Sequence, residues 1–220
     1  MITVPEIAEE IIRKSPFLEE ALSSGIINLS SLARIIQPQI QEKLYKEIKL
    51  GAIVMALKRI SSKLSKSEVS LKQLLEKIND LTVRSNIVYY TFENSSSIIS
   101  QQQELLRVLA EEKGAFLTFT DGVFETAIFA SSSLEGKIDE IFKGEKLRFK
   151  KSGLSSITII LPLDAVEVPG VYYSILKILA WEGINFVEVV SSYTELTIFM
   201  DNSNVNRAFS ALKGLNSELA

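Results

Sequence analysis

The side chains with which this chain could carry out chemistry are carboxylates, lysine, serine, threonine and tyrosine, because the sequence has no cysteine and no histidine. Disulfides, thiolate nucleophiles, imidazole bases and the usual zinc or copper sites are therefore excluded. The ten glycines are scattered singly, so no glycine-rich phosphate loop occurs. We therefore expect binding rather than catalysis, with no catalytic residue, no metal site and no cofactor.

A basic helix face is one candidate for such binding. The pattern over residues 52–64 predicts a helix with an apolar stripe on one face and Met55, basic residues and a serine on another. This face could lie along nucleic-acid phosphates, with Arg59 near base edges. A solvated face of a bundle helix would have the same composition. The polar residues of the face are Lys58, Arg59, Ser62, Lys63 and Lys66.

Short helices must position this face. Prolines and glycines punctuate residues 1–66, which we predict to be a helical head. A helix is expected over residues 31–36, and Pro38 then restarts the chain. The pair 31–36 and 52–64 suggests a helix-turn-helix with a connection longer than that of the plain motif. Residues 67–80 are predicted to form a separate connecting helix.

From Leu81 onward the hydrophobic period changes to two, which indicates strands. Strand, helix, strand, strand and helix follow twice, so the sequence predicts an internal repeat of about 65 residues. In the first pass, Asp121-Gly122 predicts a hairpin with a type I′ turn, because both residues accept positive φ. The short strands expected around the module boundary are 81–84, 87–92, 146–150 and 157–161. We place the modules at 81–152 and 153–220.

The second pass resembles a known family. The segments that carry the resemblance are Val168-Pro169-Gly170-Val171, Leu179 to Phe186, and Ser191-Ser192 followed by Glu195 to Ile198. They resemble the ACT domain, and the tandem resembles the regulatory region of aspartate kinases over roughly residues 81–214. The resemblance implies two ferredoxin-like βαββαβ modules, with residues 81–85 completing the sheet of the second. Together with the helical pattern of the head, we therefore expect an α+β protein in which an all-α N-terminal domain precedes the modules. Residues 1–80 are too few for an amino-acid kinase domain, so the likeness is to the regulatory part alone.

The resemblance also implies a ligand site. ACT domains commonly bind an amino acid near the first strand-to-helix loop of one module and the second strand of its partner. In this sequence those positions are Asp164, Val166, Pro169, Gly170 and Val171, together with Asn185, Phe186 and Val187. Gly170 opens a helix whose free N–H groups can hold a carboxylate, and Asp164 and Glu167 could meet an ammonium group. The alternative is structural, since Pro-Gly also starts helices that bind nothing.

Two functions follow from these expectations. The first is an amino-acid-responsive regulator whose helical head binds DNA, and the second is an adaptor subunit whose head binds an amino-acid biosynthetic enzyme or another protein. An enzyme is poorly supported. The second sheet face has an apolar character that requires cover by the first module, the helical domain or another subunit. The residues on this face are Thr158, Ile160, Val187, Val189 and Phe199. Since ACT modules commonly pair side by side, we also expect a homo-oligomer formed through them.

Composition bounds the remaining possibilities. With 46% hydrophobic and 23% charged residues among 220, the chain is expected to be ordered and globular. Its apolar runs are far shorter than about 18 residues, so we expect no membrane span. No basic leader precedes an apolar stretch at the start, so we expect no secretion signal and a cytoplasmic location. The net charge of −3 points to no particular partner.

Overall fold

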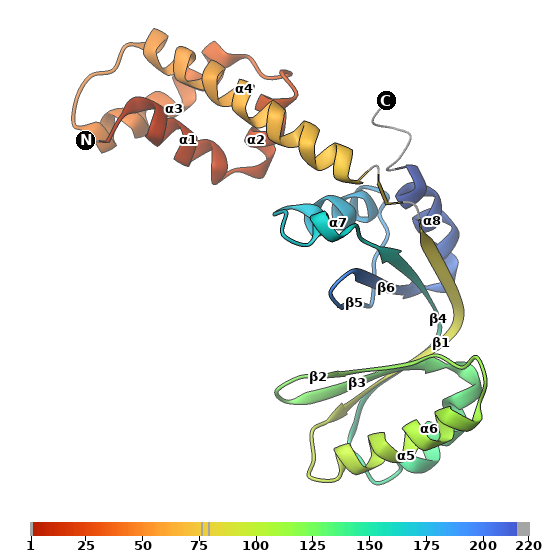
Figure 1. Ribbon diagram of the computed structural model, residues 1–220. Coiled ribbons are helices and arrows are strands. Elements are labelled where there is room, and N and C mark those ends of the chain that lie inside the picture. Colours follow the sequence, from red (N-terminus) through yellow and green to blue (C-terminus); the bar gives the residue numbers. More distant parts are fainter. Residues whose placement is uncertain (1, 76, 79, 215–220) are drawn as a thin grey trace. The chain divides into compact units, whose positions relative to one another are not determined.

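The computed structural model describes the backbone of residues 2–75, 77–78 and 80–214, and their side chains except those of 65–72 and 74 (Figure 1). The chain divides into a helical unit, Met1–Gln73, and a sheet unit, Leu74–Ala220. None of the described helices is both long enough and apolar enough to span a membrane.

The helical unit consists of α1 (Val4–Arg13), α2 (Pro16–Ser23), α3 (Leu29–Leu44) and α4 (Leu50–Leu75). The Thr3 N–H donates to Glu6 Oε2 at 2.8 Å, which satisfies a free amide at the start of α1. Gly25 ends α2 with φ +69°, and the Ile26 N–H returns to the Ala21 carbonyl. One apolar core joins all four helices, and its fully buried members include Ile7, Ile12, Leu22, Leu32, Ile36, Ile40, Ile53 and Leu57.

Two predicted helix boundaries in this unit are wrong. Pro38 lies inside α3, because Ile36 and Ile40 on either side of it are both buried in the core and packing outweighs the lost amide hydrogen bond. Helix α4 is continuous to Leu75, whereas the sequence predicts a separate helix from Ser67. Serine is only mildly unfavourable inside a helix, so Ser67 does not end it.

The sheet unit is built on one antiparallel sheet with the strand order β2-β3-β1-β4-β6-β5. Its strands are β1 (Leu81–Glu93), β2 (Leu117–Asp121), β3 (Glu125–Ser131), β4 (Leu147–Ile160), β5 (Glu188–Ser191) and β6 (Glu195–Asp201). The two modules therefore share a sheet instead of forming one each. The first module occupies the β2-β3 half and the second the β5-β6 half.

Strands β1 and β4 pass through both modules (Figure 1). Arg84 pairs with Ser156 in the second-module half, whereas Ile87 pairs with Leu154 and begins the first-module half. The register shifts between Arg84 and Ile87, close to Asn86 at φ +58° and Gly153 at φ +74°. These left-handed residues let the two strands change direction without ending. The predicted short strands on either side of this point are consequently fused into β1 and β4.

Two helices accompany each half of the sheet. They are α5 (Ile98–Glu111) and α6 (Glu135–Ile141) in the first module, and α7 (Val171–Trp181) and α8 (Val205–Gly214) in the second. Short 3-10 turns, Ser132–Leu134, Leu163–Ala165 and Asn202–Asn204, precede or connect these helices. The helix side of the first module has a closed apolar core that includes Val88, Tyr90, Leu105, Ile128, Leu134 and Ile138.

The predicted hairpin between β2 and β3 exists, but its turn type is wrong. Neither Asp121 nor Gly122 has a positive φ, so the turn is not type I′. Residues 122–124 connect the strands, and the Gly122 N–H donates to the Glu125 carbonyl at 2.8 Å. Asp121 is fixed by its side chain, which accepts hydrogen bonds from Gln102 and Thr126 at 2.7 and 2.8 Å.

In each module, the sheet face that points away from the helices is covered at its centre by the other module. Ile87, Ala127, Phe129, Leu154 and Phe199 form a buried cluster on this face. Partly buried Tyr89, Phe116, Val187 and Val190 pack against it. The packing partner that the apolar face required is thus the first module, and Val190 contributes to the cluster where Val189 was expected.

Candidate functional site

The loop before α7 holds the first group of predicted site residues. Residues 161–170 join β4 to α7, starting where the Leu161 N–H donates to the Thr194 carbonyl at 2.7 Å. Ala165 and Val171 are buried and anchor the two parts of the loop, so Val171 can offer a ligand only its backbone. Asp164, Val166, Pro169 and Gly170 are exposed.

Gly170 is the N-cap of α7 and has φ +95°. Its carbonyl accepts hydrogen bonds from the Ser174 N–H and Oγ, both at 2.9 Å. A side chain at this φ would be strained, which explains the glycine independently of any ligand. Gly170 is also exposed, and a residue without a Cβ allows a ligand to approach its backbone closely.

The carboxylate of Asp164, which the sequence suggested as a partner for a ligand's ammonium group, already has a partner in the chain. The Lys77 Nζ lies 2.6 Å from Asp164 Oδ2, and more than half of each side chain is exposed. This hydrogen bond lowers the pKa of Asp164 below its usual value. An incoming ammonium group would have to compete with Lys77 for the carboxylate.

The second group of predicted residues, Asn185 to Val187, lies before β5. Asn185 is exposed and Phe186 is half-buried. Val187 donates its N–H to the Phe199 carbonyl at 2.7 Å, and its side chain packs on the cluster between the modules. Within the described part of the chain, no hydrogen bond or ion pair joins Asn185 or Phe186 to residues 164–171.

The corresponding loop of the first module is shorter and closed by its own side chains. Residues 94–97 alone join β1 to α5. The carboxylate of Glu145 accepts hydrogen bonds from Ser95 Oγ and Ser97 Oγ, each at 2.6 Å. Ser97 is the N-cap of α5, so a carboxylate lies at the start of that helix. Glu145 is not among the predicted site residues, because nothing around it in the sequence indicates a contact with serines 48 and 50 residues earlier.

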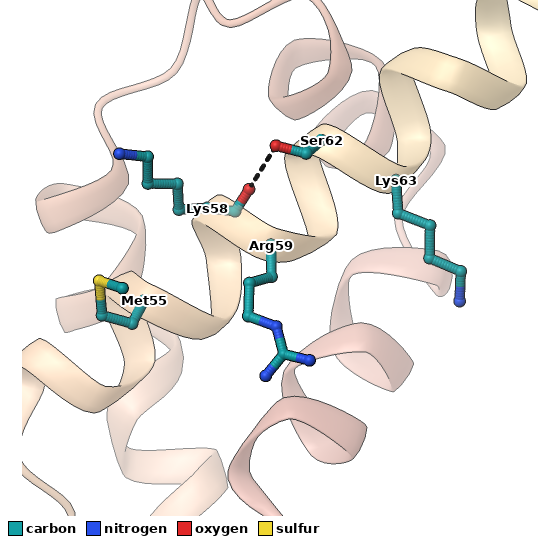
Figure 2. A pocket seen from close by; sticks show the side chains of 5 residues that line it. All are labelled: Met55, Lys58, Arg59, Ser62 and Lys63. Atoms are coloured by element: carbon teal, nitrogen blue, oxygen red, sulfur yellow. Dashed lines mark hydrogen bonds between the residues drawn. The ribbon is translucent and has the colours of Figure 1, made fainter.

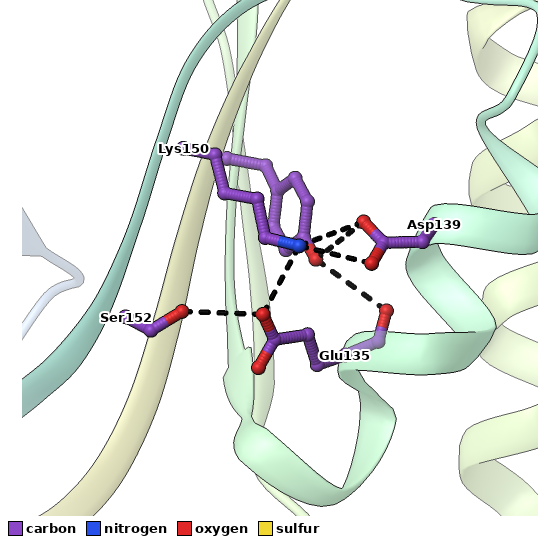
Figure 3. A network of polar contacts seen from close by, with 5 residues as sticks. Glu135, Asp139, Lys150 and Ser152 are labelled. Carbon is purple, nitrogen blue, oxygen red and sulfur yellow. Dashed lines mark hydrogen bonds and ion pairs between the residues drawn. The ribbon is translucent and has the colours of Figure 1, made fainter.

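A second polar network fastens α6 to the sheet of the first module (Figure 3). Lys150 Nζ lies 2.9 Å from Asp139 Oδ2 and 3.0 Å from Glu135 Oε1, and the Tyr90 hydroxyl donates to Asp139 Oδ1 at 2.8 Å. Burial raises the pKa of Tyr90 to about 12, and the hydrogen bond from Lys150 lowers the pKa of Asp139. Ser152 Oγ donates to Glu135 Oε1 at 3.2 Å. Every charge has a partner, which indicates a structural role.

The basic face of α4 surrounds a surface hollow of about 670 Å³ (Figure 2). The residues that line it are Met55, Lys58, Arg59, Ser62 and Lys63. Ser62 Oγ is bonded to the Lys58 carbonyl at 3.2 Å, and Lys63 Nζ lies 2.8 Å from Glu9 Oε1 on α1. Among the described side chains, Lys58 and Arg59 have no ion-pair partner. Lys66, the fifth predicted residue, has its side chain outside those that the structure describes.

Acidic residues of α1 neutralise other cations of the helical unit. Hydrogen bonds from Lys63 and then Arg13 lower the pKa of Glu9. Hydrogen bonds from Lys14 and Lys43 lower the pKa of Glu10 to about 2. Among the side chains of this face that the structure describes, Lys58 and Arg59 are therefore the cations without an ion pair, and both lie near the exposed Met55. Because α3 extends to Leu44, only residues 45–49 separate it from α4, a shorter connection than predicted.

Comparisons with known proteins identify the fold. No protein-family model and no curated protein sequence matches the chain. Aspartate kinase from Clostridium acetobutylicum is 16% identical, covers 64% of this chain with 35% of its own length, and superposes with a TM-score of 0.52. The ligand-free regulatory subunit of aspartate kinase from Thermus thermophilus is 13% identical, covers 63% of this chain with 97% of its own, and gives a TM-score of 0.50.

The chain thus spans about a third of the length of the whole aspartate kinase and nearly all of the regulatory subunit. The predicted α+β class is confirmed, and so is the likeness of the tandem modules to the regulatory region of aspartate kinases without its kinase domain. The helical unit precedes this fold, as expected.

Proposed function

We propose that this chain is a non-catalytic regulatory protein that responds to a free amino acid bound by its second module. The fold supports the regulatory role, because the two similar structures are an allosteric aspartate kinase and the regulatory subunit of another. Kinase activity and its regulation are properties of those proteins. For this chain we propose only that it senses a small ligand.

The observation that carries the proposal is the contrast between the two helix starts. In the first module, Glu145 already supplies a carboxylate at the start of α5. At the start of α7, no described carboxylate accepts a hydrogen bond from Gly170, Val171 or Tyr172, and Gly170 is exposed. The N–H groups and the positive dipole end at a helix start favour a bound anion, here the carboxylate of an amino acid.

A melting screen tests this proposal. Each proteinogenic amino acid is added to the full chain, and unfolding is followed by the fluorescence of Trp181, the single tryptophan, which lies at the end of α7. A ligand that binds only the native state stabilises it by about 2.7 kcal/mol at a concentration of about 100 Kd. One or a few amino acids should raise the melting temperature, and their D-enantiomers serve as controls. If no amino acid raises it, the sensor proposal is wrong.

The helical unit is proposed to carry the output of the sensor, with DNA as the first candidate partner. Lys58 and Arg59 favour this, since both lie on one exposed face and neither forms an ion pair with a side chain that the structure describes. Lys63 is bound to Glu9, so we assign the phosphate contacts to Lys58 and Arg59. Two such contacts predict a slope of about −2 when the logarithm of the DNA-binding constant is plotted against the logarithm of the salt concentration. The double variant Lys58→Gln/Arg59→Gln should remove duplex binding in fluorescence anisotropy, and Lys49→Gln should not. If the parent shows no binding at low salt, the adaptor alternative replaces DNA.

We also expect pairing of chains through the modules, although the first module already covers the centre of the apolar sheet face. Ile160, which is 39% exposed, remains outside this cover. Light scattering that returns only a 24.5 kDa particle would contradict the expectation.

A further inference from the structure

The first half of α4 presents one continuous exposed face. Ala52, Met55, Lys58 and Arg59 follow one another at the three- and four-residue spacing that places side chains on the same side of a helix, and all four are exposed. The opposite side of this helix is buried in the helical core through Ile53, Ala56, Leu57, Ile60 and Leu64. The core thus fixes the direction in which the exposed face points.

The character of this face changes along the helix. Gly51 and Ala52 at its start are small and exposed, and an added Cβ at Gly51 would lie in open space among the described residues. Met55 follows, with 60% of its surface exposed, and the two cations lie one turn further on (Figure 2). Residues 50–64 include no aspartate and no glutamate. A slim apolar start followed by cations suits an anionic partner with a groove that admits a helix.

Met55 is the apolar member of the set of side chains that surround the hollow on α4. Lys58 and Arg59 line the same hollow, and neither forms an ion pair with a described side chain. The hydroxyl of Ser62 is already bonded to the Lys58 carbonyl at 3.2 Å. Contacts from the cations to phosphates position a protein on DNA but carry no sequence information. Met55 is therefore the side chain of this group that is best placed to distinguish one base from another.

We infer that Met55 gives the helical unit a preference for thymine: its side chain contacts a thymine methyl group in the major groove, while Lys58 and Arg59 contact the flanking phosphates. This inference rests on the proposed binding of DNA by the helical unit. The major groove of B-DNA is about 12 Å wide and admits an α-helix, and the thymine methyl is the apolar group among the base edges there. Methionine is unbranched and polarizable, so it adapts to such a contact.

Removing the thymine methyl group isolates this contact. Uracil keeps the hydrogen-bonding groups of thymine, and the phosphates of the duplex are unchanged. Burial of one methyl group favours binding by about fourfold, so the chain should bind a thymine duplex about fourfold more tightly than a uracil duplex for each methyl contacted. The dependence of binding on salt should be the same for both duplexes, because it follows from the phosphate contacts.

Fluorescence anisotropy at low salt tests the inference with two duplexes of alternating A·T sequence, one containing thymine and the other uracil in its place. In the thymine duplex a methyl group lies in the groove at every register. Met55→Ala should bring the affinity ratio of the full chain close to one and leave the salt slope at about −2. Met55→Leu keeps an apolar side chain and should keep most of the preference. Phe17→Ala, which removes a side chain that is 76% exposed on α2, is the control and should behave like the parent.

Each outcome decides a different point. Because Met55 is exposed, its variants should melt like the parent in circular dichroism, so a changed ratio reports the contact. Equal affinity of the parent for both duplexes overturns the inference and leaves the proposed DNA binding intact. A preference that persists in full in Met55→Ala also overturns it, since the preference would then come from the shape of the duplex. If the parent binds neither duplex at low salt, DNA binding and the thymine preference are both wrong.

Discussion

The rings of Phe129 and Phe199 stack with centroids 3.9 Å apart and an interplanar angle of 19°. The two residues stand 70 positions apart, at the same place in the β3 and β6 strands of the two repeats. Ile87 and Leu154, which begin the two corresponding halves of β1 and β4, are likewise paired with each other. The modules therefore meet through equivalent residues, as a pair related by an approximate two-fold axis.

This contact predicts that the modules unfold together. Phe129 and Phe199 are fully buried, so Phe129→Ala should lower the free energy of unfolding by about 3–5 kcal/mol. Because the ring contacts the second module, the transition reported by Trp181 in urea should shift as well. Phe124→Ala, at 79% exposure on the hairpin, is the control and should change stability by less than about 0.5 kcal/mol. A Trp181 transition that does not move in Phe129→Ala would show that the modules unfold separately.

Much of the fold could be predicted because it follows from local pattern. The change of period at Leu81 and the Pro-Gly start of α7 are each encoded within a few neighbouring residues. Pro38 shows where such signals fail, since burial of Ile36 and Ile40 overrides a local breaker. Asp121-Gly122 indicated the correct hairpin with the wrong turn, because hydrogen bonds from Gln102 and Thr126 determine the geometry there.

The candidate site was harder to predict for a different reason. The partners of Asp164, Lys63 and Ser97 are Lys77, Glu9 and Glu145, and each lies far away in the sequence. Charge counts cannot distinguish a paired cation from a free one. Sequence pattern thus finds the helix that presents a side chain, whereas its availability depends on tertiary contacts.

The bend in the long strands gives a second prediction. Gly153 has φ +74° and open space around its Cα, so Gly153→Ala tests backbone strain without a clash. It should destabilise the sheet unit by about 1–2 kcal/mol. Gly144→Ala is the matched control, since Gly144 also has open space but no positive φ, and it should be neutral or slightly stabilising. Equal urea midpoints for the two variants would remove the strain argument.

A third prediction concerns acid. The pKa of Glu10 is about 2 in the folded chain because Lys14 and Lys43 donate to it, whereas 4.5 is its ordinary value. Its carboxylate therefore stabilises the fold above about pH 4.5, and this contribution is lost as the pH falls toward 2. Glu10→Gln should be less stable than the parent at neutral pH, with the difference shrinking to nothing in that range. Circular dichroism during thermal unfolding measures it, and a difference that grows on acidification would contradict the assignment.

The final prediction separates ligand contact from backbone strain at the start of α7. A valine at position 170 would be strained at φ +95°, so loss of binding in Gly170→Val could reflect a distorted loop. Asparagine tolerates positive φ and still introduces a Cβ, so Gly170→Asn should keep the parent melting temperature and weaken binding of the amino acid found in the screen by at least about tenfold. Asn185→Ala, at an exposed position, should also weaken binding if its side chain contacts the ligand. Ser96→Ala, in the exposed loop of the first module, is the control and should bind like the parent in calorimetry. Full affinity in a stable Gly170→Asn would place the pocket elsewhere, and loss of affinity in Ser96→Ala alone would exchange the roles of the two modules.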